Sequence, residues 1–374
     1  MTRGASGAVR GLPPAFWWLW AGALINRVGA FVVTFLAFYL TRELGWSPAF
    51  AGIVLALYGA GNAVGAVVGG ALADRIGRRP TLLAAHTTTA AVMAALTLAD
   101  TRAALALGVT VLGISSNAVR PANNAMIADI VEPQDRVRAF SLHYWAINLG
   151  FAISPVLGGA LAGFDYDVLF LADAATTLVT ALVIWARVPE SHPSLGPGAA
   201  ARSRDEGSTL RMVLDDRVFL AFVLVTLAIA TVIMQHLVTL PVAMADDGLS
   251  PTQYGAAMAV NGVLIVLVTV PVSSWLQRFR PTRVLALSAL LNAAGFGATA
   301  LADDLVAYAA TVAVWTLGEI LGAPISSAVA AGLSPAHARG RYQGVFTLSW
   351  SVAGAVAPLA GSGLYSAYGG TALW

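Results

Sequence analysis

A series of long apolar runs constrains this chain more than any other feature. Each run is about 20 residues long, which is the length that spans a bilayer as an α-helix. Apolar residues make up 58% of the 374 residues, and charged residues make up only 11%. A soluble domain carries about 25% charged residues, and one soluble core could not bury so many runs. We therefore predict an all-α membrane protein with 11 transmembrane helices, near residues 16–40, 49–73, 81–99, 103–127, 139–162, 168–186, 218–242, 252–276, 283–301, 304–327 and 342–364.

The connections between these runs predict an orientation. All 21 basic residues are arginine, and 17 of them lie in the N-terminal tail and in every second loop after it. The other loops hold only Arg42 and Arg102 and carry acidic residues instead. Because cytoplasmic loops are enriched in basic residues, the N-terminus is predicted to be cytoplasmic, in a multi-pass protein of the inner cell membrane.

Internal repetition divides the chain into two halves. Four features recur at a constant offset of 203 residues, which unrelated helices would not produce. We predict an N-terminal six-helix bundle at 1–187, a cytoplasmic linker rich in Pro, Gly and Ser at 188–216, and a C-terminal bundle at 217–374 with five helices and the start of a sixth. The matched pairs are Asp74-Arg75 with Gln277-Arg278, Pro121 with Pro324, Arg136/Arg138 with Arg339/Arg341, and Pro155/Gly158 with Pro358/Gly361.

Two motifs resemble those of a known family. The stretch Gly70-Ala-Leu-Ala-Asp74-Arg75-Ile-Gly77-Arg78-Arg79 is similar to the signature between helices 2 and 3 of the major facilitator superfamily. The run Gly150-Phe-Ala-Ile-Ser154-Pro155-Val-Leu-Gly158-Gly159 is similar to the helix-5 signature of its drug/proton antiporters, with Ser154 in place of a glycine. The resemblance implies the major facilitator fold, in which two pseudo-symmetric helical bundles alternate access to a central site.

Shorter segments resemble the LmrP-like multidrug antiporter subgroup of that branch, among them Asn124-Ala-Met-Ile-Ala-Asp129 and Thr316-Leu-Gly-Glu319-Ile. His143 and Leu237 stand where the subgroup has acidic residues, and Arg27 is an additional charge in the first helix. The resemblance also implies a twelfth helix. That helix would start near Gly369–Trp374, where the sequence is cut off.

Four residues are candidates for proton coupling: Glu319, His143, Asp129 and Arg120. A charge in the bilayer centre costs about 2.5–3.5 kcal/mol on insertion scales, so it needs a partner or a wet cavity. A carboxyl group that can be charged or neutral, such as Glu319, is what proton exchange requires. The alternatives are a structural hydrogen bond for Glu319, an ion pair for Arg120 and a structural role for His143.

Polar residues on helical faces predict the wall of a substrate cavity, formed by the first, fourth, seventh and tenth segments. In the fourth segment, spacings of three and four residues place Asn117, Arg120 and Asn124 on one face. Asp173, early in the sixth segment, is interpreted as a helix-packing acid. The predicted cavity residues are Arg27, Asn26, Asn117, Asn124, Gln235, His236, Asn261 and Trp315.

The two motifs have expected mechanical roles. Asp74, Arg75, Gly77, Arg78 and Arg79 mark a tight turn, in which Asp74 could accept hydrogen bonds from the N-terminus of a facing helix. Such a contact would act as a latch between conformations, although plain topology also explains the arginines. Gly150, Ser154 and Gly158 repeat every four residues, which favours close helix packing around Pro155 and Gly159.

The predicted function is secondary active transport, in which a proton gradient drives efflux of lipophilic, drug-like compounds. The sequence has no cysteine and no motif for metal-dependent hydrolysis or nucleotide binding, so we expect no enzyme, cofactor, metal or nucleic-acid partner. The expected partners are a small-molecule substrate, protons and the lipid bilayer, around a monomer. One alternative is a proton-linked carrier that binds an organic anion through Arg27 and Arg120, with both arginines facing one cavity without acidic partners. The other is a membrane receptor, although no loop is long enough for a sensing domain.

Overall fold

The structure is a computed structural model that describes residues 11–99, 101–162, 165–192 and 210–374. Within these ranges the secondary structure is helical and contains no strand. The first half holds α2 (Pro14–Val28), α3 (Val32–Phe38), α4 (Pro48–Arg75), α5 (Arg78–Leu96), α6 (Arg102–Ile130), α7 (Arg136–Ala162) and α8 (Tyr166–Arg187). The second half holds α9 (Leu210–Asp215), α10 (Arg217–Ile233), α11 (Gln235–Val238), α12 (Leu240–Asp246), α13 (Pro251–Leu276), α14 (Pro281–Ala298), α15 (Leu305–Leu333), α16 (Arg339–Tyr368) and α17 (Gly370–Leu373).

Eight of the described helical segments are long and apolar enough to cross a membrane. They include α4, α6 and α8 in the first half and the helices around α10, α13, α14, α15 and α16 in the second. The remaining three predicted spans coincide with α2/α3, α5 and α7, so eleven spans stays a prediction. Of the predicted linker, residues 193–209 lie outside the described residues, and residues 210–215 form α9.

The first long segment of each half is broken, although both apolar runs are continuous in sequence. In the first half the break lies between α2 and α3, and Asp173 of α8 caps the second piece by accepting a hydrogen bond from the Val32 N–H at 3.0 Å. The Ser154 hydroxyl of α7 donates to the carbonyl of Ala30 at 3.0 Å. Asp173 and Ser154 therefore satisfy backbone groups that the break leaves without helical partners.

The second half has its break 203 residues later, between α10 and α11. There the Gln235 amide donates to the carbonyl of Ala357, the repeat partner of Ser154, at 3.2 Å. A Cβ atom at Gly361 would lie 2.0 Å from the Gln235 side chain, just as one at Gly158 would lie 2.7 Å from the Phe35 ring. The small residues of the helix-5 motif and of its repeat therefore make room for the broken helices. The side chains of Pro155 and Gly159 lie outside the described residues.

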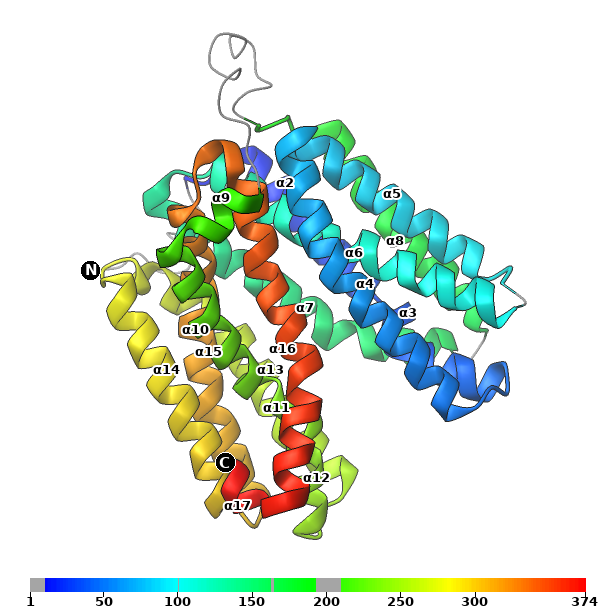
Figure 1. Cartoon of the computed structure of the whole chain (residues 1–374), viewed down its shortest axis with the longest axis vertical. Coiled ribbons are helices and arrows are strands. Elements are labelled where there is room, and N and C mark those ends of the chain that lie inside the picture. Colours follow the sequence, from blue (N-terminus) through cyan, green and yellow to red (C-terminus); the bar gives the residue numbers. More distant parts are fainter. Residues whose placement is uncertain (1–10, 100, 163–164, 193–209) are drawn as a thin grey trace.

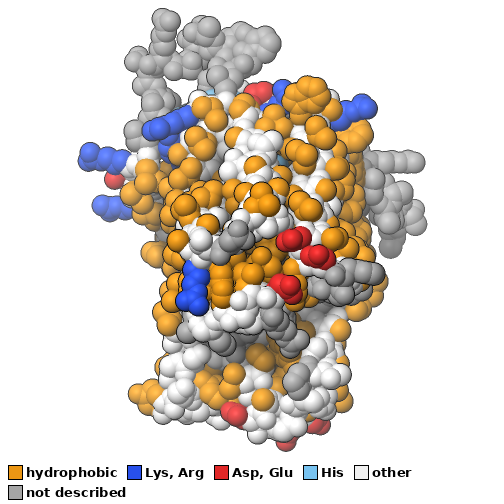
Figure 2. Space-filling model, turned by 90° about the vertical axis from the view of Figure 1, so that its right-hand side faces the viewer, with side chains coloured by type: hydrophobic (Ala, Val, Ile, Leu, Met, Phe, Trp, Pro, Cys, Tyr) orange, Lys and Arg blue, Asp and Glu red, His pale blue; other side chains and the backbone are white. Residues whose placement is uncertain are grey.

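The two halves meet at one end and separate toward the other (Figure 1). The joined end lies near α9, and α16 packs there on α4 and α6 of the first half. Figure 2 shows hydrophobic side chains over most of the visible face, with most arginines toward this upper end and acids mainly at mid-height and at the bottom of the view. We call the joined end the arginine-rich end.

Glycines on α4 show how close the halves are at each end. A Cβ atom at Gly70 would lie 2.3 Å from the carbonyl oxygen of Gly340, so the backbones of α4 and α16 are in contact there. Ala66 lies four residues before Gly70 on the same face, and its carbonyl approaches Gly344 in the same way. Gly59 and Gly52 follow on this face at intervals of seven residues, and a Cβ atom on either would meet nothing within 4 Å. The α4 face that touches α16 at the arginine-rich end is therefore uncovered at the opposite end.

Candidate functional site

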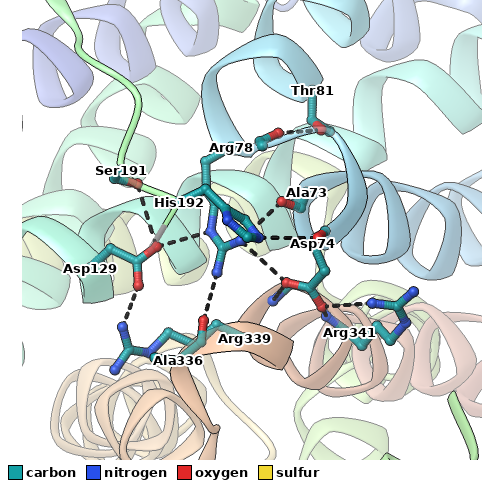
Figure 3. A network of polar contacts seen from close by, with 12 residues as sticks. Ala73, Asp74, Arg78, Thr81, Asp129, Ser191, His192, Ala336, Arg339 and Arg341 are labelled. Atoms are coloured by element: carbon teal, nitrogen blue, oxygen red, sulfur yellow. Dashed lines mark hydrogen bonds and ion pairs between the residues drawn. The ribbon is translucent and has the colours of Figure 1, made fainter. Parts of the chain in front are cut away.

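At the arginine-rich end, Asp74 connects the halves. Its carboxylate accepts hydrogen bonds from the backbone N–H groups of Gly340 at 2.7 Å and Arg341 at 2.8 Å, in the first turn of α16 (Figure 3). The guanidinium groups of Arg341 and Arg78 lie 3.2 and 3.4 Å away. A negative charge at a helix N-terminus is stabilising because it satisfies free N–H groups and the helix dipole. The contact is of the kind expected for a latch between the halves.

Arg78 lies at the centre of the same network, and its side chain is fully buried. Its Nε donates to Asp129 at 2.9 Å, and its two terminal nitrogens donate to the carbonyls of Ala73 and Ala336 at 3.0 Å. Asp129 also pairs with Arg339 across the interface. Asp129, a predicted candidate for proton coupling, makes its contacts with Arg78, Ser191 and Arg339 at this closed end. We call this network of Asp74, Arg78, Asp129, Arg339 and Arg341 the arginine-end gate.

The other latch residues shape the turn. Gly77 has φ of 104°, a left-handed conformation that favours glycine, and it precedes the first turn of α5. The Arg79 guanidinium donates to the carbonyl of Trp185 in α8, and Arg75 is exposed. The turn therefore depends on Gly77 for its geometry and on Arg79 for its attachment to α8.

The start of the inter-bundle connection docks onto this gate, which the sequence did not predict. Glu190 accepts hydrogen bonds from the backbone N–H groups of Arg78 and Arg79, both at 3.0 Å, and so caps α5. The His192 Nε2 donates to the carbonyl of Asp74 at 3.0 Å. Burial, and then the nearby Arg78 charge, lower the pKa of His192 below its usual value. An acid directly after a helix was the available signal, because such an acid can cap another helix whose N-terminus carries no cap of its own.

In the interior of the first half, Arg27 is positioned by a glycine. A Cβ atom at Gly150 of α7 would lie 2.6 Å from the Cβ and Cγ of Arg27, so only glycine lets the arginine stem cross α7. The Arg27 guanidinium then lies 4.3 Å from the centre of the exposed Phe151 ring. Asn26, beside it, donates to the Thr177 hydroxyl at 3.0 Å. The predicted helix-5 motif thus also serves to place a buried charge.

Arg120 borders the space between the halves. Its neighbours on the same face of α6 reach α16: Asn117 donates to Ser351 and Asn124 donates to Gln343, both at 3.3 Å. Arg120 itself is exposed, although it lies about ten residues, or roughly 15 Å, from the end of α6. It forms no ion pair among the described residues, which contradicts the alternative of a structural salt bridge.

Two further basic groups lie close to Arg120. Arg27 lies within electrostatic range of Arg120, and His143 of α7 lies within electrostatic range of both arginines. The His143 Nε2 accepts a hydrogen bond from the Asn123 amide at 3.1 Å, while its Nδ1 is buried with no partner in the described chain. The structure therefore gathers Arg27, Arg120 and His143 into one basic cluster.

Glu319 lies on α15, in the interior of the second half. Asn261 of α13 donates to its carboxylate at 3.1 Å and to the Thr316 hydroxyl at 3.0 Å. The buried Tyr144 hydroxyl lies close to the carboxylate and makes no hydrogen bond of acceptable geometry among the described residues. Glu319 has no ion pair in the described chain. Its hydrogen bond to Asn261 joins two neighbouring helices, which is what the alternative of a structural role for Glu319 predicts.

A cavity of about 210 Å³ lies on the other side of Glu319, within the second half. It is lined mainly by apolar residues of α10, α14 and α15, such as Ile229 and Leu285, together with the polar Asn292. In the first half, the corresponding position between α2 and α5 is filled by α8. The cavity is therefore a gap between helices of one half, and Arg120 is not among the residues that line it.

The remaining predicted cavity residues lie at the break of the second half. Gln235 is buried and bonds to Ala357. His236 stacks on buried Trp315 with ring centres 5.5 Å apart, and its Nδ1 donates to the carbonyl of Ile233. Their contacts therefore stabilise the break between α10 and α11.

The paired broken helices, the gate and the uncovered opposite end define a transporter of two repeated halves. A model of the Major Facilitator Superfamily matches residues 19–243 and 235–374, and the chain belongs to this superfamily. It is therefore a multi-pass membrane transporter and not an enzyme.

Two bacterial transporters are similar in sequence to this chain over most of their length. An uncharacterized MFS-type transporter, YttB of Bacillus subtilis, is 29% identical over 97% of this chain and 91% of its own length. The multidrug resistance protein MdtH of Edwardsiella ictaluri is 26% identical over 91% of this chain and 84% of its own. The human organic anion transporter MFSD10 (TETRAN) has the same fold, with a TM-score of 0.71 at 18% identity over 96% of each chain. Membership in the LmrP-like subgroup stays a prediction.

Proposed function

We propose that this protein is a proton-coupled exporter of lipophilic, drug-like compounds that works by alternating access in the inner membrane. The observation that carries the proposal is Glu319, a carboxylate within the span Leu305–Leu333 that has no ion-pair partner among the described residues. An unpaired carboxylate in a bilayer is costly, and protonation removes that cost. The similarity to MdtH supports multidrug efflux as the activity.

The mechanism follows from the two ends of the molecule. With the N-terminus in the cytoplasm, the arginine-end gate closes the cytoplasmic side and the central space faces outward. A proton that enters from outside neutralises Glu319 and releases a substrate bound nearby. Rearrangement then breaks the contacts of Asp74 and Asp129, and the site opens to the cytoplasm. There the next substrate favours the charged carboxylate and displaces the proton, so proton entry drives substrate exit.

Everted membrane vesicles test the coupling. Substrate accumulation from a panel of lipophilic compounds should collapse when a protonophore is added. Accumulation that survives loss of the proton gradient but disappears without sodium would replace the proton with sodium. Accumulation that survives both treatments would contradict ion-coupled transport altogether.

A further inference from the structure

We infer that the substrate of this transporter carries an anionic group, such as a carboxylate or sulfonate, that binds between Arg27 and Arg120. The inference rests on the proposed export function and narrows its substrate class. Instead of lipophilic compounds in general, the site selects amphiphiles with an anionic group. Among these, a zwitterion whose cationic end reaches Glu319 also favours the charged form of that carboxylate, as the proposed exchange requires.

The basic cluster offers hydrogen-bond donors and no acceptor. The guanidinium groups of Arg27 and Arg120 are donors only. The Asn123 amide donates to His143 Nε2, so in the neutral ring the proton lies on Nδ1, and that buried N–H has no partner among the described residues. Neither arginine donates to a carboxylate or carbonyl in the described chain, and Arg27 is satisfied only by its contact with the Phe151 ring. A ligand that supplies acceptor oxygens would provide hydrogen-bond partners for both arginines.

The acids of the interior do not neutralise this cluster. The charge of Asp173 acts on Arg27, but its carboxylate caps α3 through Val32 and lies beyond ion-pair distance of Arg27. Asp129 is held by Arg78 and Arg339 in the gate. Glu319 lies in the other half and bonds to Asn261. The charge that acts on Arg120 is thus a second cation, and that repulsion favours an anion between them.

The cluster is also accessible, which a structural charge site need not be. Arg120 is exposed although Asn117 and Asn124, on the same face of α6, bond to the second half. Its free surface therefore borders the space between the halves and not the lipid. The exposed Phe151 ring beside Arg27 provides an apolar wall for the body of an amphiphile. Planar guanidinium groups suit carboxylate geometry because they can donate two parallel hydrogen bonds.

Three probes that share a naphthalene body and differ in charge test the preference for an anion. They are naphthylacetate, its neutral amide and the matching ammonium compound. Their affinities for the purified full chain are measured by titration calorimetry. We expect the wild type to prefer the carboxylate to the amide by about tenfold or more. Arg120→Gln and Arg27→Gln should each weaken carboxylate binding roughly 10-fold to 100-fold and leave amide binding unchanged. Arg120→Lys should restore part of the preference.

Arg211→Gln is the matched control, because that side chain is 89% exposed on α9 and the substitution is the same. The carboxylate-to-amide ratio within one variant does not depend on the folded fraction of the sample. Equal wild-type affinities for carboxylate and amide, absence of carboxylate binding, or equal losses for both probes in the Gln variants would overturn the inference.

Transport in liposomes separates this inference from the proposed function. Arginine-dependent carboxylate binding without any transport driven by a pH gradient would leave the inference standing and remove proton-coupled export. The opposite result would be proton-driven export of the amide or ammonium probe that both Gln variants retain, with no preference for the carboxylate. That result would leave proton-coupled export standing and remove the inference.

Discussion

The two halves of this protein share their architecture but differ in chemistry at matching positions. Both contain a broken first segment, 203 residues apart, against which a small-residue helix packs. Yet the three members of the basic cluster, Arg27, Arg120 and His143, correspond to Ala230, Ala323 and Phe346. Glu319 corresponds to Ser116, and Asp74 of the gate corresponds to Gln277.

This difference indicates which residues serve the fold and which serve the activity. Features present in both halves, such as the breaks and the residues that pack against them, are needed to build each bundle. Charges present in only one half are not required by that architecture, and each is expensive in a membrane. They are therefore the best candidates for binding, coupling and gating, and the following predictions change them in order of expected effect.

The largest effect is expected from Glu319→Gln, which makes this position permanently neutral. The variant should lose uphill transport driven by an imposed pH gradient, on the order of 100-fold or more, because the site can no longer exchange a proton. It should still fold, since glutamine keeps the bond to Asn261 and removes a charge from within the membrane span. Purified protein in liposomes provides the measurement, and exposed Glu132→Gln is the control. Near wild-type concentration of substrate by the Gln variant would make Glu319 structural.

Asp74→Asn should open the arginine-rich end. The substitution weakens hydrogen bonds to the N–H groups of Gly340 and Arg341 and removes a charge that two arginines neutralise. Charged hydrogen bonds contribute about 1.5–3 kcal/mol, so the ratio of closed to open molecules should fall roughly 10-fold to 100-fold. Spin labels on Gln134→Cys and Arg280→Cys report the distance between halves, since the chain has no other cysteine. An unchanged distance distribution would exclude the latch, and exposed Asp303→Asn is the control.

Gln277→Asp tests the same asymmetry in the opposite direction. Leu276, directly before it, belongs to an apolar cluster against which Val137 of the first turn of α7 packs. The contact between α13 and α7 is the counterpart of the contact between α4 and α16. A carboxylate there should face free N–H groups and stabilise the closed end by about 0.3–1 kcal/mol, roughly twofold to fivefold in population. The same pair of spin labels measures the population of the closed state, and Gln277→Asn is the neutral control. If the charged and neutral substitutions behave alike, the repeat does not offer a second latch.

The smallest effect concerns pH at His192. Because docking lowers its pKa, the docked segment binds fewer protons than the free segment near pH 6.5. Docking should therefore be complete above this pH and weaken as the pH falls below it. Hydrogen exchange at residues 188–192, corrected for its intrinsic pH dependence, should increase roughly twofold to threefold between pH 7.5 and 5.5. In His192→Gln this increase should disappear, and a persisting increase would exclude His192 as the group responsible.

The gate and the basic cluster were predictable to different degrees. The acid among the arginines of the 74–79 turn predicted a helix-capping latch, and Asp74 makes that contact. The stripe of Asn117, Arg120 and Asn124 predicted a shared face, and α16 lies against it. The role of Glu190 was missed, because its partners lie more than 100 residues earlier in the sequence. The helix breaks were missed because apolarity is continuous through both of them.

The sequence by itself determined the membrane helices, the predicted orientation and the two-fold repeat. Each follows from local composition or from self-similarity, which needs no knowledge of the partner across space. Only the tertiary structure decided which charges within the membrane spans are satisfied. Asp173 and Asp129 have partners on other elements, whereas Arg120 faces a second cation. Helical periodicity gives the face on which a charge lies, but the energy of a charge in a membrane depends on what the fold places opposite it.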